Sequence, residues 1–215
     1  MIRGCIFDLD GTLVQTNGVW EWAAKEYMRR CGVEPEERLA DVMYTMTIQQ
    51  TADYCREHYG VEQTQQQIID GINGIMDVYY RTKADAKPGA EQLLRALSAR
   101  GIPMAIASVT DKDLVRAALE HNGIDGYFTG ISTTTEVGAG KQKPDVYLAA
   151  AAMLGARPEE CVVFEDAPHG LKTAREAGFL TAAMADEAGE EKSALMRSLS
   201  DYFLRALTDF PVEEL

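Results

Sequence analysis

The chain has 215 residues, 46 % of them hydrophobic, which is enough for one large domain or for one domain with a modest insertion. Its formal net charge is -13 at pH 7, and an acidic surface disfavours nucleic acids and anionic membranes as partners. No stretch of the sequence approaches the roughly 20 apolar residues of a membrane span.

The four cysteines and the first residues bear on the compartment. No two cysteines share a C-x-x-C spacing, and Cys5 and Cys161 lie in apolar runs, so free buried thiols are favoured over disulfides. The opening MIRGCIFDLD has one basic residue and a short apolar run broken by acids, which is unlike a signal peptide. We therefore expect a cytoplasmic protein.

Strands and helices are expected to alternate along most of the chain. A buried strand is predicted over residues 2–9, and the pattern resumes near residue 87. The predicted helices from there on cover residues 88–101, 110–123, 143–155 and 169–178. The predicted strands cover residues 102–108, 127–133, 161–166, 179–184 and, more weakly, 200–207. Such alternation indicates a parallel sheet covered by helices on both faces.

Two helix starts have capping patterns. Thr110 and Asp113 form a T-x-x-D opening, which resembles a capping box at the start of the 110–123 helix. Thr47 is a possible N-cap for a helix over residues 47–60.

The residues between the first strand and residue 87 are predicted to be helical. Helices are expected over residues 19–32 and 47–60, and a less regular one over 63–86, weakened by Gly71 and Gly74. We therefore predict an α/β core domain formed by residues 1–14 and 87–215, interrupted by a helical domain at residues 15–86.

Polar residues stand where the predicted strands end. In parallel α/β sheets, sites lie at the carboxyl ends of the strands. The residues found there are a hydroxyl, a lysine and several carboxylates: Ser108, Lys141, Asp8, Asp10, Glu165 and Asp166. Alternation along the strand directs Asp8 and Asp10 to one side and Leu9 into the core.

Asp8, Asp10 and Asp166 would bring three carboxylates into one crevice, and their repulsion costs free energy unless a cation neutralises them. Oxygen ligands select a hard cation, and Mg2+ suits one or two carboxylates completed by waters and a substrate phosphate. Lys141 and Ser108 would then be available to phosphoryl oxygens. Backbone N–H groups of Gly11 and Thr12 could add donors. The set of groups therefore points to phosphoryl transfer.

Four motifs resemble those of the haloacid dehalogenase-like hydrolase superfamily. They occur in the expected order as DLDGTL, the serine of IAS, GKQKPD and VVFEDAPHG. The early helical insert resembles the C1-type cap of subfamily I, in the β-phosphoglucomutase and phosphoglycolate phosphatase group. The resemblance implies a Rossmann-like parallel sheet with an inserted helical cap domain.

The resemblance also implies roles for these residues. Asp8 matches the nucleophile that forms an aspartyl-phosphate, and Asp10 matches the general acid/base. Ser108 and Lys141 match the phosphate-holding groups. The Mg2+ ligands would be Asp166, the Asp8 carboxylate and the Asp10 main-chain carbonyl, with Glu165 in support.

One position of the third motif departs from the family pattern. Gln142 stands where the family usually has a proline, which leaves Lys141 and Lys143 two residues apart. Alignment on Pro144 makes Lys141 the motif lysine.

The resemblance implies a Mg2+-dependent phosphatase acting on a small phosphorylated metabolite. A sugar phosphomutase of the β-phosphoglucomutase type is the alternative within the family. Trp20 stands where that mutase pattern has a histidine, and residues 41–50 contain no Lys or Arg, which weakens the mutase interpretation. Substrate-contacting residues of the cap are expected to include Trp20, Tyr44 and Thr47.

Two interpretations lie outside the enzyme class. A phospho-acceptor receiver also uses acids, a hydroxyl and a lysine around Mg2+, but such modules are shorter and have no D-x-D. A non-catalytic binding protein is disfavoured because every expected catalytic group is present. The protein is expected to be a monomer or a homodimer.

Overall fold

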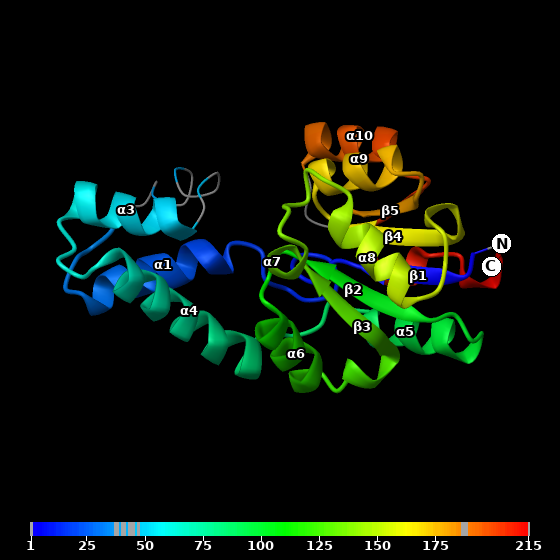
Figure 1. Ribbon diagram of the computed structural model, residues 1–215, viewed down its shortest axis with the longest axis horizontal. Helices are drawn as coiled ribbons and strands as arrows, with labels where there is room; N and C mark the ends of the chain where they lie inside the picture. Colours follow the sequence, from blue (N-terminus) through cyan, green and yellow to red (C-terminus); the bar gives the residue numbers. More distant parts are fainter. Residues whose placement is uncertain are drawn as a thin grey trace. The chain divides into compact units, whose positions relative to one another are not determined.

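The computed structural model describes residues 2–36, 39, 42, 46, 48–185 and 189–214. The chain forms two compact units. One unit is Thr16–Lys83, and the other combines Met1–Gln15 with Ala84–Leu215. Figure 1 shows that the described part of the first unit is helical and that the second contains the sheet. The expected Thr47 cap lies outside the described residues.

The helical unit is built around one long helix. Its described helices are α1 (Val19–Arg30), α3 (Ile48–Tyr59) and α4 (Gln65–Thr82). Both α1 and α3 pack against α4. Thr64 and Gln67 form a reciprocal capping box at the start of α4. Ile68, Ile72 and Met76 recur every four residues along α4 and are buried, as an amphipathic helix requires.

The expected helix within residues 63–86 is present as α4, and it runs unbroken through Gly71 and Gly74. A Cβ at Gly71 would lie 1.9 Å from Cε2 of Tyr27 in α1. Gly71 therefore allows two helices to approach closely. A Cβ at Gly74 would meet nothing within 4 Å, so the same residue type has no packing role one turn later.

The other unit contains a six-stranded sheet in which every pairing is parallel. Its strands are β1 (Gly4–Phe7), β2 (Met104–Ser108), β3 (Phe128–Thr133), β4 (Cys161–Glu165), β5 (Leu180–Met184) and β6 (Tyr202–Leu204). The spatial order is β3-β2-β1-β4-β5-β6. The predicted α/β class with a parallel sheet is confirmed, and β1 and β4 lie side by side at its centre.

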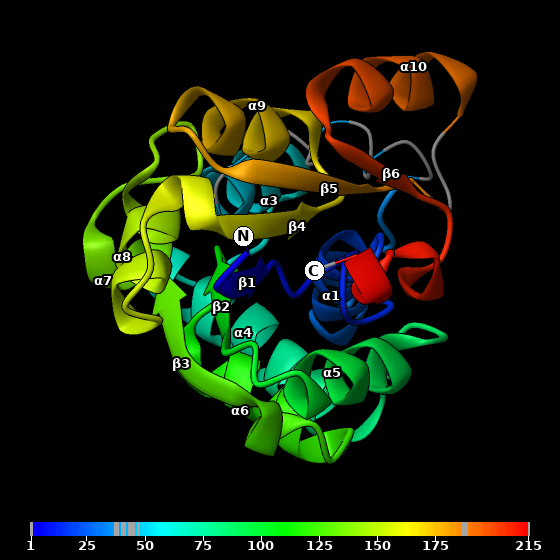
Figure 2. The ribbon, with the colours of Figure 1, turned by 90° about the vertical axis from the view of Figure 1, so that its right-hand side faces the viewer.

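Helices cover both faces of this sheet, as Figure 2 shows. They are α5 (Ala90–Ala99), α6 (Lys112–His121), α7 (Thr134–Val137), α8 (Asp145–Met153), α9 (Pro168–Glu176) and α10 (Glu190–Leu199). Short 3-10 helices cover Asp125–Tyr127, Pro158–Glu160, Leu207–Asp209 and Val212–Glu214. In Figure 2, α9 and α10 lie on one side of the sheet and α5 and α6 on the other.

Strand β1 is covered on both faces of the sheet, and all four of its residues are buried. Ile6 belongs to a core cluster with Tyr147 of α8 and Ala174 of α9. Phe7 stacks on Phe164 of β4 with ring centroids 4.3 Å apart. A fully buried parallel strand reads as a continuous apolar run, and this one ends directly before Asp8.

Candidate active site

Three strands of the sheet end at one edge and bring the chemically active residues together. Asp8 directly follows β1, and its N–H donates to the carbonyl of Phe164 at 3.0 Å. Ser108 is the last residue of β2, and Glu165 is the last residue of β4. Because β1 is paired in parallel with both β2 and β4, these residues share the carboxyl edge.

Lys141 links Asp8 to Glu165 inside the protein. Its Nζ lies 2.5 Å from Asp8 Oδ1 and also donates to Glu165 Oε1. Tyr147 donates to the same Oε1 at 2.8 Å, and the N–H of Ala167 donates to Oε2 at 3.2 Å. All of the linked side chains of Asp8, Lys141, Glu165 and Tyr147 are buried, so the lysine is held by charged partners on two strand ends.

The electrostatics of this group are dominated by burial and by an excess of carboxylates. Burial raises the pKa of Asp8 well above its usual value, and Glu165, Asp166 and Asp10 add to the rise while Lys141 opposes it. Burial alone lowers the pKa of Lys141, but the charges of Asp8 and Glu165 outweigh it and the pKa is raised. The surroundings of Lys141 therefore favour its charged form.

Asp166 is a second carboxyl with a perturbed pKa. Burial, followed by the charge of Glu165, raises the pKa of Asp166 to about 6, although Lys192, Lys141 and Lys87 act in the opposite direction. Carboxyls with raised pKa values beside one another are typical of functional sites.

Asp8, Glu165 and Asp166 form a group that fits a metal ion. Each offers a carboxylate oxygen, and these atoms lie within 4.8 Å of one another. The donors are all oxygen, which suits a hard cation such as Mg2+. A divalent cation would also balance charges that raise the pKa values of Asp8 and Asp166.

The turn after Asp8 departs from expectation. Gly11 has φ 79°, a left-handed conformation that favours glycine. The N–H of Gly11 donates to the carbonyl of Val14, and that of Thr12 to the carbonyl of Leu9. Both backbone donors are thus used inside the turn, and the expectation that they face a phosphate is not supported. The hydroxyl of Thr12 is buried and has no partner among the described residues.

Asp10 is held by a residue that the motif comparison did not single out. Thr110 Oγ1 donates to Asp10 Oδ2 at 2.6 Å, and the N–H of Thr110 donates to Ser108 Oγ at 3.0 Å. The predicted capping box of Thr110 with Asp113 is wrong, because the N-cap of α6 is Asp111. The Thr110 hydroxyl binds a carboxyl group 100 residues away in sequence instead of the helix backbone.

Three buried residues of this region were missed from the sequence. Tyr147 was missed because its spacing in α8 is that of an ordinary core residue. Thr110 was missed because its sequence pattern is that of a helix cap. Lys87 is only 4 % exposed, although it lies in a polar stretch that gave no sign of burial. By contrast, Lys143 is exposed while Lys141 is buried, which agrees with the assignment of Lys141 as the motif lysine.

The expected cap residues belong to the helical unit. Trp20 lies near the start of α1 and is half-buried. Tyr44 and Thr47 lie outside the residues that the structure describes.

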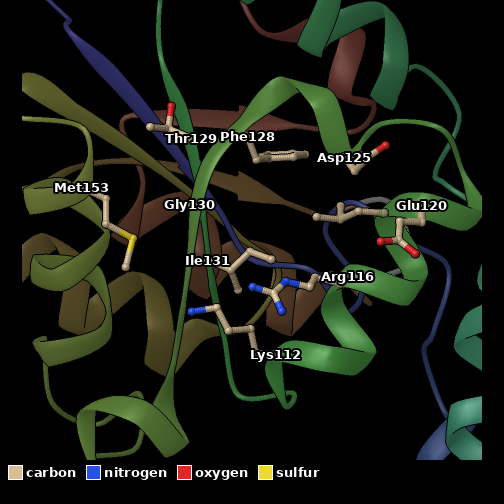
Figure 3. A pocket seen from close by; sticks show the side chains of 10 residues that line it. Lys112, Arg116, Glu120, Asp125, Phe128, Thr129, Gly130, Ile131 and Met153 are labelled. Carbon is tan, nitrogen blue, oxygen red and sulfur yellow. The ribbon is translucent and has the colours of Figure 1, made fainter.

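A hollow of about 510 Å³ lies beside the edge strand β3 (Figure 3). It is lined by residues of α6, β3 and α8, and shares no residue with the carboxylate group. Its two cations already have acidic partners: Lys112 Nζ lies 2.7 Å from Glu136, and Arg116 lies 3.7 Å from Asp113. We assign no phosphate site to this hollow.

Among the described helices, none combines the length and the apolar character needed to cross a membrane. Comparison with protein families gives a match over residues 2–178 to the model described as haloacid dehalogenase-like hydrolase. That range contains every motif residue of the site.

Two individual proteins that are similar to this chain are named as phosphatases. Hexitol phosphatase A of Escherichia coli K12 is 34 % identical over 185 residues, covering 82 % of this chain and 80 % of the relative. The probable pseudouridine-5'-phosphatase of Drosophila melanogaster is 28 % identical over 220 residues, covering 99 % and 93 %. The solved structure of a putative β-phosphoglucomutase from Thermotoga maritima has a TM-score of 0.86 at 21 % identity and covers all of both chains, which shows the same fold.

Proposed function

Because the chain belongs to the haloacid dehalogenase-like hydrolase family, we propose that it is a Mg2+-dependent phosphatase that hydrolyses a small phosphorylated metabolite through an aspartyl-phosphate on Asp8. The observation that carries the proposal is the buried pairing of Asp8 with Lys141, next to Asp166, at the end of β1. A nucleophile needs an available lone pair, and a bound phosphate needs positive charge beside it. Asp8 and Lys141 supply these two features at the end of β1.

The proposed reaction has two steps. In the first, a carboxylate oxygen of Asp8 attacks phosphorus, the bond from phosphorus to the leaving oxygen breaks, and Asp10 gives that oxygen a proton. In the second, water attacks the phosphorus of the aspartyl-phosphate and Asp10 takes a proton from the water. The bond from phosphorus to the Asp8 oxygen breaks, which releases inorganic phosphate and restores the Asp8 carboxylate. Ser108 and Lys141 hold the phosphoryl oxygens in both steps.

The metal ion would be held by the carboxylates of Asp8 and Asp166 and by the main-chain carbonyl of Asp10, with Glu165 in support. When bound, Mg2+ supplies positive charge that balances the phosphoryl oxygens and the carboxylates. Lys141 supplies the remaining cation from the protein side and keeps Asp8 oriented through its contact with Oδ1.

The names of the relatives support a sugar or nucleoside phosphate as the substrate class. In this proposal the helical unit Thr16–Lys83 acts as the cap and selects the substrate, with Trp20, Tyr44 and Thr47 as its contact residues.

A phosphate-release screen tests the proposal. Purified protein with Mg2+ is incubated with sugar phosphates, nucleotides and p-nitrophenyl phosphate, and released phosphate is measured over many turnovers. Asp8→Asn should abolish turnover in a folded protein. A parent that releases no phosphate from any substrate, or an Asp8→Asn variant as fast as the parent, would overturn the proposal.

The same screen separates the alternatives. A phosphomutase would convert glucose 1-phosphate to glucose 6-phosphate faster than it releases phosphate. A phospho-acceptor receiver would release at most one phosphate per chain, and a binding protein would release none.

A further inference from the structure

The hydrogen bond between Thr110 and Asp10 joins two strand ends that are far apart in sequence. Thr110 Oγ1 lies 2.6 Å from Asp10 Oδ2, a distance within the range of a hydrogen bond from a hydroxyl to a carboxyl oxygen. Thr110 is 3 % exposed, so water competes little for this contact. The bond crosses from the loop after β2 to the loop after β1.

Thr110 is itself fixed by the phosphate-site serine. Its N–H donates to Ser108 Oγ at 3.0 Å, so the Ser108 oxygen accepts one hydrogen bond while its own O–H hydrogen can be donated elsewhere. A continuous chain of contacts therefore runs from Ser108 through Thr110 to Asp10.

The contact restrains the carboxyl group of Asp10. Because Thr110 Oγ1 binds Oδ2, the carboxyl plane is held in one orientation. Proton transfer requires the acid/base to lie within hydrogen-bond reach of the reacting oxygen. A restraint on this plane therefore bears directly on the proposed role of Asp10.

A purely local role for Thr110 does not account for these contacts. A helix N-cap threonine would use its hydroxyl to accept a bond from the backbone of the first helical turn. The N-cap of α6 is Asp111, and the Thr110 hydroxyl donates to a side chain on another strand end.

We propose that Thr110 is the positioning residue of the general acid/base: its hydroxyl holds Oδ2 of Asp10 so that the carboxyl group keeps the orientation in which it exchanges a proton with the leaving group and with water. The proposal rests on the proposed function, since it concerns the same reaction. It adds a residue that no family motif quoted above includes and that does not itself touch the reacting atoms.

Two aryl phosphates of similar size test the proposal. Phenyl phosphate has a poorer leaving group than p-nitrophenyl phosphate and depends more on a proton from Asp10. General acid catalysis contributes about 10²–10⁴-fold, so misplacing the acid should remove a part of this. Thr110→Val, with Mg2+ present, should lower kcat/KM for phenyl phosphate roughly 10- to 100-fold and for p-nitrophenyl phosphate less than about threefold.

Two further variants control for effects other than positioning. Thr110→Ser keeps the hydroxyl and should restore the parent ratio of kcat/KM between the two substrates. Thr135→Val removes a hydroxyl bond of 2.9 Å to Asp111, which is also a hydroxyl–carboxylate contact but not one to Asp10. It should leave the ratio unchanged. An equal loss on both substrates in Thr110→Val, or no loss on either, would overturn the proposal.

Crystal structures of the parent and of the two Thr110 variants give a readout that is independent of activity. The Asp10 carboxyl should keep its orientation in Thr110→Ser and lose it in Thr110→Val. An Asp10 side chain that is unchanged in Thr110→Val would show that Thr110 does not orient it. Absence of phosphate release by the parent would instead overturn the proposed function, and the crystal comparison would still decide whether Thr110 orients Asp10.

Discussion

Replacing Lys141 by methionine should strongly destabilise the sheet-containing unit, because two buried carboxylates lose their counter-charge. The Lys141 side chain is 4 % exposed, and its partners Asp8 and Glu165 are 6 % and 1 % exposed. Removing one partner of a buried ion pair costs about 3–5 kcal/mol. For a chain of this size the loss corresponds to roughly 6–20 °C in the midpoint of thermal unfolding.

The stability difference between the parent and Lys141→Met should increase as the pH rises. Burial raises the pKa of Asp8 above its usual value of 3.8, and Lys141 limits the rise, so removal of the lysine raises the folded-state pKa further. A raised folded-state pKa gives stability that is present below the unfolded pKa and is lost as the pH rises through the folded pKa. The stability gap between the parent and Lys141→Met should therefore widen as the pH rises above the usual range of aspartate.

Thermal unfolding in EDTA, followed by circular dichroism, measures both effects. Lys143→Met is the matched control, because Lys143 is two residues away and exposed; its stability should stay within about 0.5 kcal/mol of the parent. Adding Asp8→Asn to Lys141→Met removes one stranded charge and should recover part of the loss. Equal midpoints for the two lysine variants near neutral pH, or a gap that narrows as the pH rises, would refute the reasoning.

Three other substitutions or conditions give separate tests. Tyr147→Phe removes one hydrogen bond to the charged Glu165 and should lower the free energy of unfolding by about 1.5–3 kcal/mol; an unchanged denaturant midpoint would contradict this. Because the pKa of Asp166 is about 6 in the metal-free protein, Mg2+ affinity measured by calorimetry should fall as the pH drops through that value, and a constant affinity would argue against Asp166 as a ligand. In α4, Gly71→Ala should cost about 1–3 kcal/mol through overpacking, whereas Gly74→Ala should stabilise the helix by up to about 1 kcal/mol; the opposite order of thermal midpoints would count against the close approach of α1.

The parallel sheet and its site edge could be predicted from the sequence because both depend on local patterns. Apolar runs of strand length alternate with helical segments, and the residues at the end of each run lie at the carboxyl edge of the sheet. That is why Asp8, Ser108 and Glu165 were expected at one edge and lie there. The resemblance to haloacid dehalogenase-like hydrolases is confirmed over residues 2–178.

The features that were missed depend on partners distant in sequence. Thr110 has a local capping pattern, in which its hydroxyl would accept from the helix backbone. In the structure the hydroxyl instead donates to the Asp10 carboxyl group from another strand end. Gly71 disfavours a helix by propensity, but the ring of Tyr27 needs the space that a Cβ would occupy. Helix α10 was not predicted because Met196 is its single buried residue, which leaves little apolar periodicity to detect.

The contacts of Glu165 indicate different roles for the three clustered carboxylates of Asp8, Glu165 and Asp166. Its Oε1 accepts from both Lys141 and Tyr147, and its Oε2 accepts from the N–H of Ala167, so both oxygens are engaged by protein donors. A Cβ at Gly170 would lie 2.6 Å from Oε1, so the absence of a side chain at Gly170 makes room for this carboxyl group. We infer that Glu165 holds Lys141 against Asp8, and that Asp8 and Asp166 are the carboxylates left to bind the proposed metal ion.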